Sequence, residues 1–171
     1  MTSRRRTLAI GALVLVVQEA LVPQVRILGV FPDIIPAFVI CVAVVGEVGQ
    51  ATVVGFVMGI LEDLFLVGPF GVSGLTYTLL AYLTGRVGQS TEWKGSSSAI
   101  AVVCFFGTVL SELGHGLILA LLGNSTLSRP GSILGYLLVG LINLLVGPVI
   151  ARYLQGGRTR PAMSAPQVAG L

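Results

Sequence analysis

The stretch VVGFVMGILEDLFLVGPFGVSGLTYTLLAYLTG, residues 53–85, decides the fold class. Two apolar runs flank a short turn, residues 68–75, that is rich in glycine. A helix needs about 20 apolar residues to cross a bilayer, with about 17 near the lower limit. Two adjacent acids, Glu62 and Asp63, stand at the end of the first run. The stretch therefore predicts a pair of membrane helices with two carboxylates at one end.

The composition of the whole chain also indicates a lipid environment. Of its 171 residues, 54% are hydrophobic and only 10% are charged, whereas an ordinary soluble domain has about 25% charged residues. Such a chain cannot cover itself with a polar surface. No stripe of Lys and Arg predicts a nucleic-acid surface. Cys41 and Cys104 lie in apolar segments, where we expect small buried side chains.

Hydropathy predicts an all-α integral membrane protein with six transmembrane helices in one domain, residues 1–154. The spans are expected at roughly 7–22, 32–47, 50–67, 71–88, 98–122 and 132–154. The basic and then apolar N-terminus is like a signal peptide, but no small-residue cleavage site follows, so we interpret it as a retained helix. Residues 155–171, rich in Gly, Pro and Ala, predict a flexible cytoplasmic tail.

Basic residues predict the orientation. With six spans and an inner N-terminus, eight of the ten Lys and Arg residues fall inside, and only Arg26 and Arg129 fall outside. This is a clear positive-inside bias. Trp93 and Lys94, in an inner loop, are expected to be interface anchors. Both termini are therefore predicted to be cytoplasmic.

The second span is the least regular. Pro32 suits the first position of a helix, and Asp33 would then lie where the helix dipole favours an anion. Pro36, one turn later, is expected to kink the helix and shorten its span.

Gly55, Gly59, Glu62 and Asp63 share one arc of the third predicted helix. The two glycines would let another helix pack closely. For the acids three environments are open: interfacial water, a polar contact with a partner helix or loop, or a polar pocket. Adjacent residues point about 100° apart, so the doublet is unsuited to metal binding or acid–base catalysis.

Other polar groups lie within the predicted spans. Glu19 is near the end of the first, and Asn143 is near the middle of the sixth. Glu112 and His115 share a face of the fifth. Their spacing occurs in di-metal helices, but the chain has one histidine, so we expect a hydrogen-bonded pair or a partner contact. We predict no metal site, no cofactor and no catalytic residues, because the chain has no nucleophile elbow and no phosphate-binding loop.

The order and spacing of these motifs resemble the MreD family of rod shape-determining membrane proteins. The resemblance is carried by Gly55, Phe56, Gly59, Asp63, Gly71 and Leu75. Pro32 and Asp33 resemble the opening of the family's second helix, and Arg129 with Pro130 resembles a step before its last. The specific part covers about forty residues. The Glu62–Asp63 doublet departs from the family, whose members often have an apolar residue before the Asp.

The resemblance implies a function and a fold. It implies a non-enzymatic scaffold of the bacterial elongasome in the inner membrane, which binds MreC and helps control cell shape and peptidoglycan synthesis. Indirect partners would be the RodA and penicillin-binding protein 2 pair and MreB filaments. The fold would resemble the substrate-binding subunits of energy-coupling-factor transporters.

Two alternatives remain at this point. One is a substrate-binding membrane subunit of a small-molecule, vitamin-type importer, with residues 68–75 as a gate. The other is an enzyme acting on a lipid-linked substrate, for which Glu112 with His115 is the only candidate acid–base pair. Ligand uptake would favour the importer, and loss of rod shape on depletion would favour the scaffold.

Overall fold

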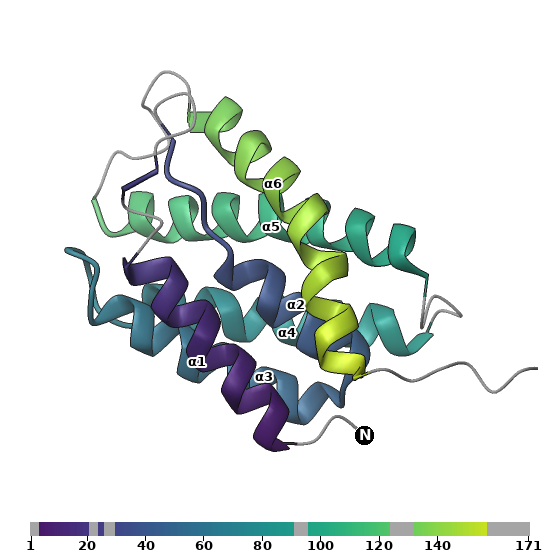
Figure 1. The fold of residues 1–171 in the computed structure, drawn as a ribbon. Helices are drawn as coiled ribbons and strands as arrows, with labels where there is room; N and C mark the ends of the chain where they lie inside the picture. Colours follow the sequence, from purple (N-terminus) through teal and green to yellow (C-terminus); the bar gives the residue numbers. More distant parts are fainter. Residues whose placement is uncertain (1–3, 21–23, 26–29, 91–95, 124–131, 157–171) are drawn as a thin grey trace, which may run out of the picture.

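A computed structural model describes residues 4–20, 24–25, 30–90, 96–123 and 132–156. These residues form six α-helices, as the hydropathy pattern predicts (Figure 1). The helices are α1 (Arg4–Ala20), α2 (Ile35–Val45), α3 (Val48–Asp63), α4 (Val72–Ser90), α5 (Ser97–Leu121) and α6 (Ser132–Gln155). The predictions made for Arg26, Trp93, Lys94, Arg129, Pro130 and most of the tail lie outside the described residues.

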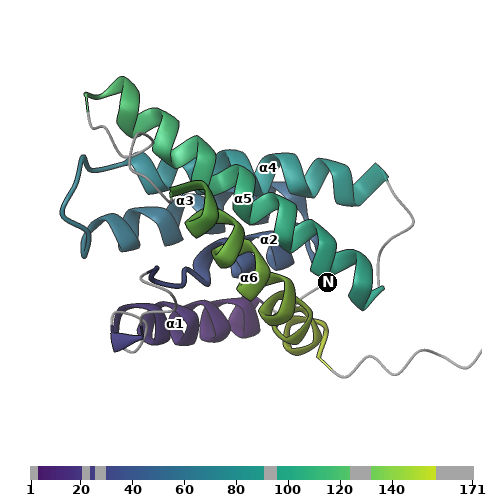
Figure 2. The same cartoon turned by 90° about the horizontal axis from the view of Figure 1, so that it is seen from above.

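Helix α2 is the core of the molecule. Every residue from Ile35 to Val44 is buried, and α2 contacts all five other helices, which surround it in both views (Figures 1 and 2). Its sequence, IPAFVICVAVV, has no polar side chain apart from the thiol of Cys41. A helix with apolar residues on all sides is suited to burial within other helices.

The start of α2 corrects the sequence prediction. The helix begins at Ile35, so Pro36 occupies its first turn and Pro32 lies before it. Proline in the first turn lacks only an N–H that has no intrahelical partner, and so Pro36 starts the helix and does not kink it. With 11 residues, α2 extends only about 16 Å.

The exterior of the helical body is apolar. Long side chains such as Val53, Phe106 and Leu145 are more than half exposed. Among the described helices, α5 and α6 are long and apolar enough to cross a membrane, and α2 is apolar but shorter. Exposed leucine, valine and phenylalanine side chains in these numbers are the surface expected in contact with lipid.

The two ends of the helical body are distinguished by the helix ends that lie there. At one end, which we call the Arg152 end, α1 begins and α6 finishes, with Arg6 lying against Gly156. Arg6 and Arg152 border a cavity of about 670 Å³ there. At the opposite end, which we call the Gly71 end, α3 finishes and α4 begins. The start of α1 and the end of α6 thus lie together, as the even number of predicted spans requires.

Candidate functional site

Helices α3 and α4 form a tight seam. A β-carbon at Gly55 would overlap the backbone of α4 at Tyr77, and one at Gly59 would overlap it at Ser73. The close approach predicted for these glycines is therefore made by α4 of the same chain. A partner helix cannot occupy this face while α4 is in place.

Asp63 closes the seam at the Gly71 end. Its Oδ2 accepts hydrogen bonds from the N–H of Gly71 (2.8 Å) and of Gly74 (3.4 Å), and its Oδ1 accepts one from the N–H of Ser73 (3.3 Å). These are free N–H groups at and before the start of α4, where a carboxylate also complements the helix dipole. Gly71 has φ +96°, a conformation that favours glycine. Asp63 thus holds the turn onto the next helix.

Glu62 points elsewhere, into a polar pocket near the Gly71 end. This pocket has a volume of about 230 Å³. It draws residues from α1, α3, α4, α5 and the segment before α2. The lining residues are Gln18, Phe31, Pro32, Asp33, Glu62, Leu66, Ser73, Tyr77, Ser111, Glu112 and His115.

One side of the polar pocket is fully hydrogen-bonded. The hydroxyl of Tyr77 donates to Oδ2 of Asp33 (2.7 Å), and Oδ1 of Asp33 accepts from the N–H of Ile35 (3.0 Å). Gln18 donates to the carbonyl of Pro32 (3.3 Å) and accepts from the N–H of Ile34 (3.0 Å). Asp33 therefore lies beside the start of α2, as predicted, and these contacts fix the chain entering α2.

The other side of the pocket has buried polar atoms without partners. Oε2 of Glu62 and Oγ of Ser73 have no hydrogen bond, although the two residues are 6% and 0% exposed. Glu112 and His115 also face the pocket, but no hydrogen bond joins these two described residues, in contrast to the predicted pair. Buried polar groups normally have a partner, so these two atoms are exceptions within the described part of the chain.

Asn143 links three elements behind the pocket. It is fully buried, and its Nδ2 donates to the carbonyl of Asp33 (2.7 Å) and to the hydroxyl of Thr108 (3.0 Å). The amide thus ties α6 to α5 and to the segment before α2. Asn143 is a structural contact within the chain.

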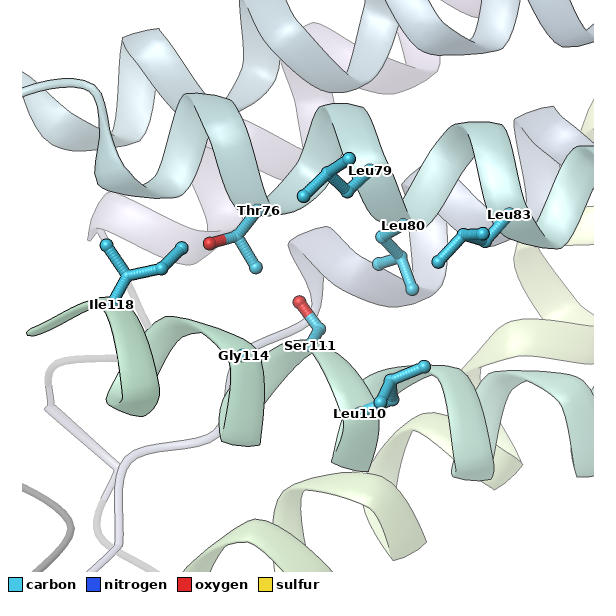
Figure 3. A pocket seen from close by; sticks show the side chains of 8 residues that line it. All are labelled: Thr76, Leu79, Leu80, Leu83, Leu110, Ser111, Gly114 and Ile118. Carbon is cyan, nitrogen blue, oxygen red and sulfur yellow. The ribbon is translucent and has the colours of Figure 1, made fainter. Parts of the chain in front are cut away.

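A second cavity, of about 190 Å³, lies between α4 and α5 (Figure 3). Figure 3 shows Thr76 of α4 and Ser111 of α5 on facing helices, among leucine side chains. The hydroxyl of Thr76 donates a hydrogen bond to the carbonyl of Val72 (2.8 Å). Ser111 lines both this cavity and the polar pocket. The second cavity is otherwise apolar and offers little to a polar ligand.

The remaining predicted residues lie apart from the polar pocket. Phe56 and Leu75 are about half exposed on the outer surface. Glu19 is half-buried near the end of α1 and does not line the pocket. Among the described residues, no three His, Cys, Asp or Glu side chains are placed to hold a metal ion.

Sequence reasoning missed Ser73, Tyr77 and Thr108. Ser73 and Tyr77 are one turn apart on α4 and follow directly on the turn that Asp63 holds. That spacing puts them on one helix face, and this pattern could have identified them from the sequence. Thr108 gave no such signal, because its role depends on Asn143, 35 residues away.

A comparison with known families identifies the chain. The sequence model of the family described as rod shape-determining protein MreD matches residues 5–154. This chain belongs to the MreD family. MreD proteins are membrane proteins that act in determining rod shape, and the apolar helices described above agree with that setting. No curated protein and no solved structure matches the chain, so the predicted likeness to energy-coupling-factor subunits gains no support from a known structure.

Proposed function

We propose that this MreD-family chain is a non-enzymatic scaffold of the bacterial elongasome. In this proposal it lies in the cytoplasmic membrane with six spans and with its Arg152 end and tail in the cytoplasm. It binds the bitopic protein MreC and through it supports the RodA and penicillin-binding protein 2 pair and MreB filaments. Its contribution to peptidoglycan synthesis and cell shape is then to hold partners together.

The apolar exterior of the helical body carries this proposal. Leucine, valine and phenylalanine side chains project from the outer faces of α1, α3, α4, α5 and α6, and the longest connections within the described residues are short turns. For a member of a family that acts in determining rod shape, this lateral surface is the means of contact that we propose. Membrane helices associate through such surfaces by close packing and a few polar contacts.

We revise the proposed position of the partner contact because several candidate residues are used within the chain. Gly55 and Gly59 are covered by α4, and Asp63 is used by the turn before α4. Of the residues first proposed for the contact, only Glu62 keeps a free carboxylate oxygen. We therefore place the polar part of the contact at Glu62.

The family match does not favour the importer reading, because the matched family is defined by rod shape determination. For the enzyme reading, Glu112 and His115 face the polar pocket without a hydrogen bond between them. Their substitution to Gln and Asn with retained function would remove that reading.

Depletion of the chain followed by microscopy tests the proposal. Cells are expected to lose rod shape, and expression of the intact chain is expected to restore it and to co-purify the bitopic partner. Glu47→Gln, at the exposed start of α3, serves as a control and should also restore shape. Normal rods after depletion, or a product formed by the purified chain from a lipid-linked precursor, would contradict a scaffold role.

A further inference from the structure

The polar pocket combines acidic side chains with buried polar atoms that have no hydrogen-bond partner. It is bordered by the carboxyl groups of Asp33, Glu62 and Glu112. Among the described residues, no ion pair neutralises any of them. Carboxylates gathered away from bulk water repel one another, and a cation between them offsets that repulsion.

Two buried oxygen atoms in the pocket have no hydrogen-bond partner, and both can act as acceptors. Oε2 of Glu62 is buried without a partner, and so is Oγ of Ser73 on the neighbouring helix. The unpartnered hydroxyl of Ser73 is evidence independent of the acids, since it is uncharged and fully buried. Both atoms accept hydrogen bonds from an N–H group. A donor entering here would meet them together with Glu112.

We propose that the polar pocket receives a lysine or arginine side chain of a partner polypeptide, whose cationic group pairs with Glu62 and Glu112 and donates to Ser73. Only the identity of the partner rests on the proposed scaffold function. Charge-assisted hydrogen bonds to carboxylates are short and strong, and pairing with another ionisable group is the usual arrangement for an acid inside a membrane protein.

The lining chemistry favours a side chain over a lipid headgroup. An ethanolamine headgroup carries a phosphate next to its ammonium group, and the three carboxylates would repel that phosphate. Among the described residues that line the pocket, none is a lysine or arginine able to receive it. A basic side chain brings a cation on an apolar stem, which suits the pocket's mixture of acids with Phe31 and Leu66.

The first test uses the intact chain in phosphatidylcholine nanodiscs and a probe of defined chemistry. Millimolar n-propylguanidinium chloride is expected to raise the thermal midpoint of the wild type, because a ligand that binds only the folded state stabilises it. Sodium chloride at equal ionic strength gives the baseline. Glu62→Gln should abolish the rise, whereas Glu47→Gln, at the exposed start of the same helix, should keep it.

Three results would overturn the assignment. One is the absence of any rise for the wild type, and another is an equal rise in Glu62→Gln. The third is a larger rise with phosphoethanolamine than with propylguanidinium, which would assign the pocket to a lipid headgroup.

The second test measures the partner. Glu62→Gln should reduce recovery of the co-purified bitopic partner on the order of tenfold, with unchanged recovery for Glu47→Gln. Full recovery with Glu62→Gln would overturn the proposed contact. If the wild type binds the probe but recovers no partner, the scaffold proposal fails while the cation chemistry of the pocket is supported. The two proposals can therefore fail separately.

Discussion

The α3–α4 seam and the polar pocket share one end of the molecule but differ in how complete they are. In the seam, glycines meet backbone without space for a β-carbon, and Asp63 accepts three backbone hydrogen bonds. In the pocket, one residue earlier in the chain, Glu62 keeps a buried oxygen without a partner. This contrast indicates that Asp63, and not Glu62, stabilises the fold.

The largest expected effect is on the seam, from Gly59→Leu. A leucine side chain would overlap the backbone of α4 at Ser73, and rigid backbone cannot move aside as a flexible side chain can. We expect a loss of stability above the usual cost of about 1–3 kcal/mol for overpacking, and little monodisperse protein on size-exclusion chromatography.

Gly49→Ala is the matched control for Gly59→Leu. Gly49 lies on the same helix with nothing within 4 Å of an added β-carbon, so it should leave the chromatogram unchanged. A well-folded Gly59→Leu protein with an unaltered melting temperature would show that the seam is looser than described.

The next largest effect is expected from Asp63→Ala. Three N–H groups at the turn before α4 would lose their acceptor, and each unsatisfied buried group costs about 1–3 kcal/mol. Water reaching this end will reduce the sum, so we expect about 2–4 kcal/mol and a lower thermal midpoint in detergent. Asp63→Asn keeps one acceptor oxygen and should fall between Ala and the wild type. Equal midpoints for all three proteins would contradict the role of Asp63.

A smaller loss is expected from Asn143→Leu, which removes the hydrogen bonds to Asp33 and Thr108. Side-chain hydrogen bonds within membrane proteins average about 0.6 kcal/mol and reach about 1.7 kcal/mol. Because Asn143 is fully buried, we expect a value near the upper figure, measured by thermal unfolding. Thr108→Val, which removes one of the two contacts, should cost less than Asn143→Leu, and the reverse order would count against the described network.

The smallest effect on stability is expected from Glu62→Gln. The substitution keeps the shape of the side chain and replaces a carboxyl group whose Oε2 has no hydrogen bond in the free protein. The melting temperature should therefore stay the same or rise slightly. Asp63→Asn, the neighbouring substitution of the same kind, should lower it, so the pair measured side by side tests the contrast directly. A large drop in melting temperature for Glu62→Gln would show that Glu62, like Asp63, stabilises the fold.

Much of the helical framework could be predicted from hydropathy and from the glycine and proline residues that interrupt helices. The apolar runs and the glycine-rich turn at 68–75 predict six helices, and the structure has them. The start of α2 was predicted at Pro32 and lies at Ile35, because either of two nearby prolines can begin a helix. Burial of Cys41 and Cys104 was also predicted from their apolar neighbours and is confirmed.

The candidate site was less predictable. The sequence placed Gly55, Gly59, Glu62 and Asp63 on one arc, which predicted a close helix contact at the glycines and left interfacial water, a partner contact or a polar pocket open for the acids. The structure shows α4 against both glycines and backbone N–H groups around Asp63. A small-residue face predicts that some helix approaches, but it does not state which one, since any helix backbone fits against glycine.

From the amino-acid sequence alone one can predict a lipid environment, six helices and the turn that brings α4 back along α3. These follow from local hydropathy and from residues that interrupt helices. Only the tertiary structure decided which of two adjacent acids is used within the fold. Glu62 and Asp63 diverge by about 100° around α3, and the surroundings of each depend on α4, α5 and the segment before α2, which lie far apart in the chain.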